Sequence, residues 1–415
     1  MTSAPDLEAL VRATPDSRDR AMDFLRAASI VAVVFGHWFI SINHWQDGLI
    51  RSTSAIGVTS GLWLFTWVFQ VMPIFFFVGG FSNVVAYDSA VRKGWSTGTF
   101  VRRRLERLLR PSLVFLGLWA FVQIALHVAD VGAPAGPRLW GETTLLRGMR
   151  PPGATIPFGP LWFLGVYLVV VVIAPVTIRL HRRLGLWVPL AMGLGAAVVD
   201  LVAFSTGAWG WRWLNVAFVL LLPHQLGHAY ADGTFATWPR RRFWAMVLGG
   251  LGGLAALTTP WLFRVLGDAR FSWFPGIGHY PKSLLGTDVE AVSNAYPPTV
   301  CFLLGGVWTL GAVLLAKPQL DRWLRRERPW RFTIVVNARI MTLFLWHMTA
   351  YLLALLALWP LGLGREQDST ARWWLERPIW LGVPAVILLG LIALFGRFER
   401  GRHPVPGDDG AAPRR

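Results

Sequence analysis

The sequence contains very little cysteine and little charge. Its 415 residues include one cysteine, Cys301, so an internal disulfide and a cysteine-based metal cluster are both excluded. Only 15% of the residues are charged, while 54% are hydrophobic. Several apolar stretches approach the roughly 20 residues that a helix needs to cross a bilayer. The composition therefore indicates an all-α membrane protein, a polytopic bundle of transmembrane helices.

Several nucleotide and metal motifs are also missing. The sequence contains no G-x-x-x-x-G-K-[ST] phosphate loop, no G-x-G-x-x-G turn and no H-E-x-x-H zinc motif. These absences argue against an ATP-driven pump, an enzyme with a nucleotide cofactor and a zinc protease. We expect no bound metal.

Positive charge is abundant, at a net +17. Such a balance also occurs in proteins that bind nucleic acid, but here the basic residues lie in short loops between apolar runs. That pattern is typical of topology signals and lipid headgroup contacts, and the 24 tryptophans suit the two membrane interfaces. We therefore expect the lipid bilayer, and not nucleic acid, as the partner of these charges.

The apolar runs predict about ten spans. With the N-terminus placed in the cytoplasm, 27 lysines and arginines fall in cytoplasmic segments and 11 fall in outside loops, so both termini are predicted to be cytoplasmic in a multi-pass protein of the plasma (inner) membrane. Residues 1–20 form the N-terminal cytoplasmic segment, 21–399 the membrane domain, and 400–415 a disordered tail. The predicted spans are 21–43, 61–86, 112–130, 160–180, 184–205, 212–231, 243–265, 297–316, 338–360 and 377–397.

The first span carries ionisable residues, which are costly inside a membrane and mark a candidate functional site. Asp23, Arg26 and His37 fall near one face of the helix, because 11 positions at 100° per residue bring His37 back to within about 20° of Arg26. His37 lies roughly 16 Å beyond Arg26 along the helix. Arg26 at the helix end could simply reach the headgroups, with Asp23 as its (i, i+3) partner. His37 is too deep for that, so it either performs chemistry or bonds a neighbouring helix. His44 is interpreted as interfacial.

A basic segment precedes the third span, which is predicted to begin at Pro111. Arg104, Arg107 and Arg110 follow at (i, i+3) spacing, so a helix would present them together. Such clusters commonly anchor a protein on anionic lipid, whereas the functional alternative is phosphate binding through forked hydrogen bonds.

Other polar residues carry weaker signals. His224 and His228 have the (i, i+4) spacing of metal ligands, but without a third ligand nearby they favour polar packing. Asp200 and His127 are expected to be solvated at outer helix ends. His347, Asn337 and Arg339, in or near the ninth span, receive no role. In the second span Pro73 predicts a bend, and Gly79–Gly80 predicts close approach to a neighbouring helix.

The motifs together resemble those of the acyltransferase family 3 membrane proteins. The opening R-A-M-D-F-L-R-A-A-S-I-V-A-V-V-F-G-H-W is similar to that family's Arg, ten residues, then His signature. M-P-I-F-F-F-V-G-G-F-S-N at 72–83 resembles its second-span motif, with Gly79 where the family often has Ser. Arg104 and Arg107 fit its R-x-x-R motif, as do Arg107 and Arg110. Three further segments are similar: G-P-L-W-F-L at 159–164, L-G-H-A-Y-A-D-G at 226–233 and L-F-L-W-H-M at 343–348.

The resemblance implies an integral membrane O-acyltransferase. It would move an acyl group, with acetyl as the expected group, from cytoplasmic acetyl-CoA or another acyl-CoA to a hydroxyl of a sugar, lipid or secondary metabolite. His37 would be catalytic, as a general base or as the carrier of an acyl-imidazole. The residues implied in binding coenzyme A are Arg26, Arg104, Arg107 and Arg110, with Asp23, Ser82, Asn83 and Trp162 in support.

Two other classes remain open from the residues. Buried charge and broken helices are equally typical of a secondary transporter or exporter of a small metabolite, although no inverted repeat is visible. A membrane sensor or scaffold is the third class, and it would tolerate loss of His37.

Overall fold

The computed structural model is built almost entirely of helices. It describes residues 11, 14–15, 18–46, 49–128, 158–259, 279–286 and 292–399. The long helices are α2 (Arg20–Ile40), α5 (Met72–Arg92), α6 (Thr97–Val128), α8 (Leu161–Leu184), α9 (Trp187–Thr206), α10 (Leu214–Ala231), α11 (Arg240–Thr258), α13 (Val300–Trp323), α15 (Ile340–Leu358) and α16 (Ala371–Phe395). Shorter elements are α3 (Ala55–Val58), α4 (Trp63–Val68), α14 (Glu327–Asn337), the strands β1 (Ser41–Gln46) and β2 (Leu49–Ser54), and the 3₁₀ turns η2 (Trp209–Trp213), η3 (Thr234–Thr237), η4 (Trp359–Leu361) and η5 (Gly396–Phe398).

Eight of these helical segments, among the described residues, are long and apolar enough to cross a membrane. They occupy eight of the ten predicted ranges, which confirms a multi-pass membrane protein. The two remaining ranges hold α10 and α11. Neither is among the eight candidate spans; Asn215, His224, Gln225 and His228 make α10 less apolar, and α11 begins with three arginines.

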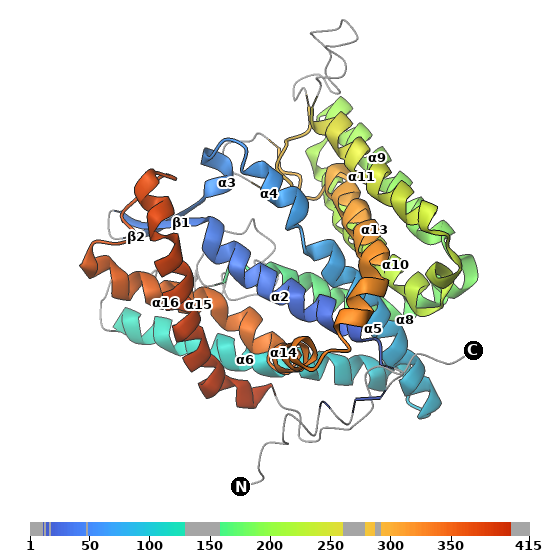
Figure 1. Cartoon of the computed structure of the whole chain (residues 1–415), viewed down its shortest axis with the longest axis horizontal. Helices are drawn as coiled ribbons and strands as arrows, with labels where there is room; N and C mark the ends of the chain where they lie inside the picture. Colours follow the sequence, from blue (N-terminus) through green and yellow to red (C-terminus); the bar gives the residue numbers. More distant parts are fainter. Residues whose placement is uncertain are drawn as a thin grey trace, which may run out of the picture.

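Helix α2 lies in the middle of the molecule, between two groups of helices (Figure 1). Its first turn is capped by the Asp19 side chain, which accepts a hydrogen bond from the Met22 amide at 3.1 Å. Helices on both sides pack against α2, so its side chains can contact several other helices. The helices in contact with α2 are α5, α13, α14, α15 and α16.

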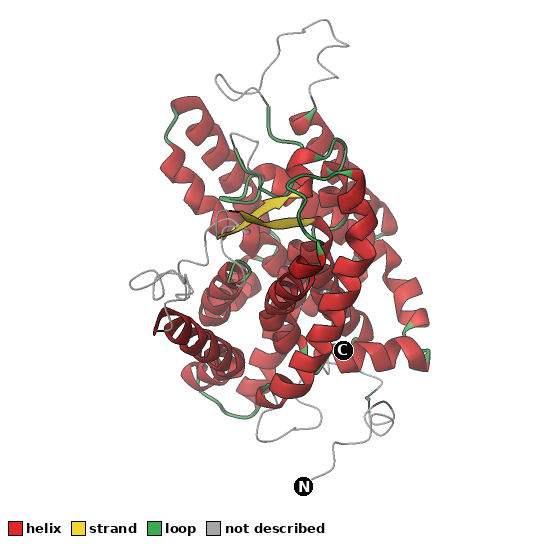
Figure 2. Ribbon diagram, turned by 90° about the vertical axis from the view of Figure 1, so that its left-hand side faces the viewer, coloured by secondary structure: helices red, strands yellow, loops and turns green. Residues whose placement is uncertain are grey.

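The chain leaves α2 earlier than the sequence predicts. The first span was expected to continue to residue 43, but the helix ends at Ile40 and residues 41–54 form the β1–β2 hairpin. This hairpin is drawn as the yellow pair of strands in Figure 2. Residue 44 therefore belongs to a strand, and its side chain lies outside the described ones. The two strands contain Ile42, Trp45, Ile50 and Thr53, which are residue types enriched in strands.

Glycines bring α5 and α10 into backbone contact. A Cβ on Gly80 would lie 2.0 Å from the His224 carbonyl oxygen, and one on Gly227 would lie 2.1 Å from the Phe77 oxygen. The predicted close approach of this glycine region is confirmed. Pro73 does not kink the helix from within; it lies in the first turn of α5, after a break that separates α4 from α5.

The helix that holds the third span begins well before Pro111, because α6 runs unbroken from Thr97 to Val128, and the basic segment is its first part. Intramembrane helices tolerate proline where neighbouring groups satisfy the freed backbone. Asp200 is not solvated but fully buried, where it accepts hydrogen bonds from Asn215 at 2.8 Å and from the Val300 amide at 2.9 Å.

Most of the predicted outside loops at 131–159 and 266–296 lie outside the described residues, as do the predicted tail 400–415 and the side chain of residue 127.

The α5–α10 contact yields a stability prediction. Gly80→Ala or Gly227→Ala should lower the free energy of unfolding by at least about 1–3 kcal/mol, because a methyl group would overlap backbone atoms that cannot move aside. Thermal unfolding of the purified protein in detergent measures the effect. Gly249→Ala on α11 is the matched control, since nothing lies within 4 Å of its added Cβ. Equal melting temperatures for all three variants would contradict the prediction.

Candidate active site

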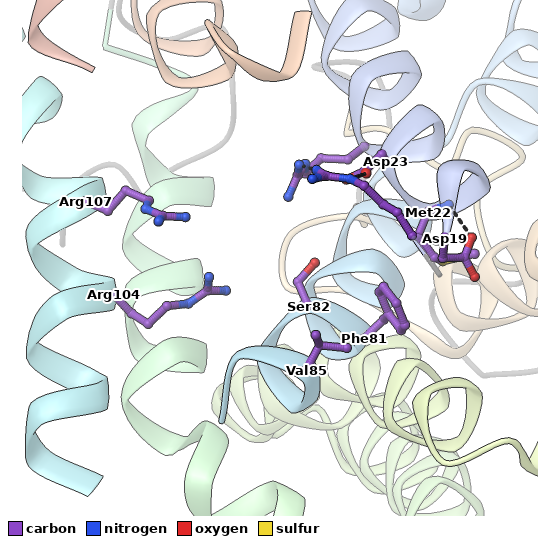
Figure 3. A pocket seen from close by; sticks show the side chains of 10 residues that line it. Asp19, Met22, Asp23, Phe81, Ser82, Val85, Arg104 and Arg107 are labelled. Atoms are coloured by element: carbon purple, nitrogen blue, oxygen red, sulfur yellow. Dashed lines mark hydrogen bonds and ion pairs between the residues drawn. The ribbon is translucent and has the colours of Figure 1, made fainter. Parts of the chain in front are cut away.

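A pocket lies where the start of α2 faces α5 and α6. Figure 3 shows Arg104 and Arg107 pointing from one side toward Ser82, with Asp19, Met22 and Asp23 on the other side. Its empty volume is about 450 Å³, part of which is open to solvent. The residues that line it are Arg18, Asp19, Met22, Asp23, Arg26, Phe81, Ser82, Val85, Arg104 and Arg107.

Five residues predicted from the sequence line this pocket. Asp23, Arg26, Ser82, Arg104 and Arg107 come from three different helices and meet there. Arg18 and Asp19 also line it and were missed, because they precede the apolar run. Their only sequence signal is the position of Asp19 as a helix cap.

Arg26 is held in place by two partners. Its Nη2 donates to Asp23 Oδ1 at 3.1 Å, and its Nε donates to Asn337 Oδ1 at 2.7 Å. The Asn337 amide donates in turn to the Asp23 carbonyl at 2.9 Å. The predicted Asp23–Arg26 pair is thus confirmed, and Asn337, which received no role, connects α14 to α2. Asp23 also accepts from Arg18 Nε at 2.5 Å.

Arg104 is held by a chain of buried groups. Its Nη2 donates to Asn83 Oδ1 at 2.7 Å, and the Asn83 amide lies 3.1 Å from His224 Nε2. Asn83 and His224 are both fully buried. Because the arginine requires the amide oxygen, the amide nitrogen faces the imidazole, which therefore accepts. Asn83 supports the pocket from behind without lining it.

His224 and His228 take the polar packing role that the lack of a nearby third ligand favours. His228 Nδ1 lies 3.2 Å from Gln225 Oε1, inside α10. The described residues contain no group of three His, Cys, Asp or Glu side chains placed to hold a metal ion.

Near the end of α10, burial raises the pKa of Asp232, but hydrogen bonds from His181 and Thr234 outweigh this effect and hold that pKa below its ordinary value.

Two more predicted residues, Arg110 and Trp162, lie outside the pocket. Arg110 is exposed on α6, one turn beyond Arg107, and does not line the pocket. Trp162 is partly buried in an apolar cluster and meets the Phe163 ring edge-on, with ring centroids 6.3 Å apart. Of the three arginines expected to act together, the structure brings two to the pocket.

His37 lies in the last turn of α2, beside His347 of α15. The two rings are nearly coplanar and meet edge to edge, with planes 10° apart and centroids 5.1 Å apart, and His37 Nδ1 lies 2.8 Å from His347 Nε2. His347 is fully buried, whereas His37 is partly exposed. The sequence flagged His347 but assigned it no role, because its partner is 310 positions away in the chain.

The two ends of α2 therefore offer different chemistry. The pocket gathers four guanidinium groups, from Arg18, Arg26, Arg104 and Arg107, against the two carboxylates of Asp19 and Asp23. A net positive, partly open site of this kind suits a phosphate-bearing ligand. His37 lies roughly 16 Å away along the same helix and supplies a proton-accepting group.

These features define a multi-pass helical membrane protein with a basic pocket and a candidate group-transfer site. The chain belongs to acyltransferase family 3: the family model described as an acyltransferase domain (Acyl_transf_3) matches residues 19–401. The protein is therefore a membrane acyltransferase, as the resemblance implied, and the transporter and scaffold alternatives lose their support. No curated protein and no solved structure gave a match.

The Arg26 anchor yields a second stability prediction. Asn337→Ala should lower the free energy of unfolding by about 1–3 kcal/mol, because Arg26 and the Asp23 carbonyl both lose a partly buried hydrogen bond. Thermal unfolding in detergent measures the loss. Glu327→Gln is the control on the same helix, because it weakens only an exposed ion pair with Arg331, worth about 0.5 kcal/mol. The reverse order of the two effects would contradict the assigned role of Asn337.

Proposed function

We propose that this acyltransferase takes an acyl group from cytoplasmic acyl-CoA and transfers it to a hydroxyl of a sugar, lipid or secondary metabolite. Acetyl is the acyl group that we expect. The observation that carries the proposal is the pocket in which Arg26, Arg104 and Arg107 converge from α2 and α6. Coenzyme A carries several phosphate charges, and guanidinium groups bind phosphate through two parallel hydrogen bonds.

The proposed orientation follows from the charge distribution. We place α10 and α11 in the membrane with the other eight helices, which gives ten spans and both termini in the cytoplasm of a plasma-membrane protein. The basic first part of α6 then lies on the cytoplasmic side, where acyl-CoA is available. The pantetheine arm has a length comparable to the roughly 16 Å between Arg26 and His37, so the thioester would reach the imidazole.

The transfer needs one proton acceptor. His37 removes the proton from the acceptor hydroxyl as its oxygen attacks the thioester carbon. The carbon–sulfur bond then breaks, and the coenzyme A thiolate leaves and takes up a proton. An acyl-imidazole on His37 would divide the same exchange into two steps, with the acyl group passing from sulfur to nitrogen and then to oxygen. Both routes need an unprotonated ring nitrogen on His37.

The first functional prediction concerns His37. The wild-type protein in nanodiscs should release free coenzyme A slowly from acetyl-CoA, with water replacing the acceptor. His37→Ala should slow this release by about 10²–10⁴-fold, because general base catalysis contributes on that scale. Acetyl-CoA should still bind, since the pocket lies at the other end of α2. Wild-type release by a folded His37→Ala variant would refute the role of His37.

The second functional prediction concerns the Arg104–Asn83 pair. Arg104→Ala should weaken acetyl-CoA binding by about 10- to 100-fold, since a hydrogen bond to a charged group contributes about 1.5–3 kcal/mol. Asn83→Ala should weaken it by about fivefold, because Arg104 loses an anchor. The double variant should bind no more weakly than Arg104→Ala alone, since the two side chains act through one guanidinium.

Arg102→Ala is the matched control for this pair. Arg102 lies on the same turn of α6 and faces Glu106 at 3.8 Å on the surface. Isothermal titration of acetyl-CoA should give wild-type affinity for this variant. Strictly additive losses in the Asn83/Arg104 double variant would show that Asn83 does not act through Arg104.

A further inference from the structure

The hydrogen bonds of His347 determine which of its ring nitrogens carries a proton. His347 Nδ1 lies 2.7 Å from the Phe344 carbonyl oxygen. A carbonyl oxygen only accepts hydrogen bonds, so Nδ1 of His347 must donate and must be protonated. In a neutral imidazole the other nitrogen then has a lone pair. The Nε2 atom of His347 is therefore an acceptor.

This acceptor faces His37 Nδ1 at 2.8 Å. Two lone pairs would repel each other at that distance, so His37 Nδ1 must carry a proton and donate it to the hydrogen bond. A neutral His37 then has its lone pair on Nε2. The chain of bonds from the Phe344 carbonyl through His347 selects one tautomer of His37.

The surroundings hold His347 still. The indole nitrogen of Trp38, the residue after His37, donates to the His347 carbonyl at 3.0 Å. Side chains of α2 therefore bond both the backbone and the ring of His347. The two hydrogen-bonded rings differ in plane by only 10°, and His347 is fully buried. His347 therefore has little freedom to exchange its partners for water.

We infer that His347 is a positioning residue, which fixes His37 in the tautomer whose Nε2 is free to accept a proton from the substrate. This inference rests on the proposed function. When Nε2 of His37 takes the proton, the ring becomes positive and its Nδ1–H bond to His347 becomes charge-assisted. His347 thus both selects the reactive tautomer and stabilises the protonated ring, without touching the substrate. The same lone pair would serve as nucleophile in the acyl-imidazole route.

Two substitutions at this position separate positioning from packing. His347→Phe keeps a ring of similar size but removes the acceptor, and it should lower kcat for coenzyme A release about 100-fold at an unchanged KM. His347→Gln keeps an amide oxygen within reach of His37 Nδ1, and its kcat should stay within about tenfold of wild type. A purely structural role would not distinguish the two variants in this way once both are shown to be folded.

Tyr351→Phe is the matched control. Tyr351 lies one turn further along α15, and its hydroxyl donates to the Ser41 carbonyl at 3.2 Å, so the variant removes another α15 hydrogen bond to the end of α2. We expect its kcat to match wild type.

A direct measurement does not depend on activity. Solid-state NMR of ¹⁵N-histidine-labelled protein in nanodiscs distinguishes protonated from unprotonated ring nitrogens, and a His37→Gln sample assigns the His37 signals. The expected result is a protonated Nδ1 and an unprotonated Nε2 on His37 in wild type. Protonation of Nε2 instead would overturn the inference, even if no variant of His347 folds.

The outcomes separate the inference from the proposed function. If His37→Ala is inactive while His347→Phe keeps wild-type kcat, the inference is wrong and the proposed function stands. If folded wild-type protein neither binds nor hydrolyses acetyl-CoA, the proposed function fails, and the NMR result alone decides the tautomer.

Discussion

The structure depends on satisfying the polar stripe of α2 inside an apolar bundle. Charged and polar groups that leave water must find partners, and α2 finds them on other helices. Arg26 bonds Asp23 and Asn337 at one end, and His37 bonds His347 at the other. The bonds to Asn337 and His347 tie α2 to α14 and α15, which are remote in the chain. The same side chains that form the candidate site therefore also determine how the bundle is assembled around α2.

The glycine contact between α5 and α10 serves the same site from further away. Gly80 and Gly227 allow the two backbones to touch, and this places His224 behind Asn83. Asn83 then presents its oxygen to Arg104. The close packing of α5 and α10 thus orients a charged group: the buried Asn83 amide, held by His224, directs the Arg104 guanidinium toward the pocket. An arginine held in this way loses less side-chain entropy when it binds a phosphate than a free one would.

In the proposed function, the two ends of α2 separate donor binding from chemistry. The pocket is basic and partly open, whereas the histidine pair is set in apolar packing roughly 16 Å along the helix. A long donor with charge at one end and a reactive thioester at the other matches this separation. The carbonyl of Phe344, acting through His347, would then control the protonation pattern of His37 without contacting any substrate.

The sequence by itself determined the membrane class, the family and the pairing of Asp23 with Arg26, because hydropathy, the Arg–His spacing and (i, i+3) geometry are local properties of the chain. It also identified five of the residues that line the pocket. Only the tertiary structure decided that Arg104 and Arg107 face α2 while Arg110 does not, that Asp200 is buried, and that α6 continues through Pro111. The partners Asn337 and His347 lie more than 300 positions from Arg26 and His37, and helix packing brings them together. No local pattern encodes such a contact, so their roles became visible only in the folded chain.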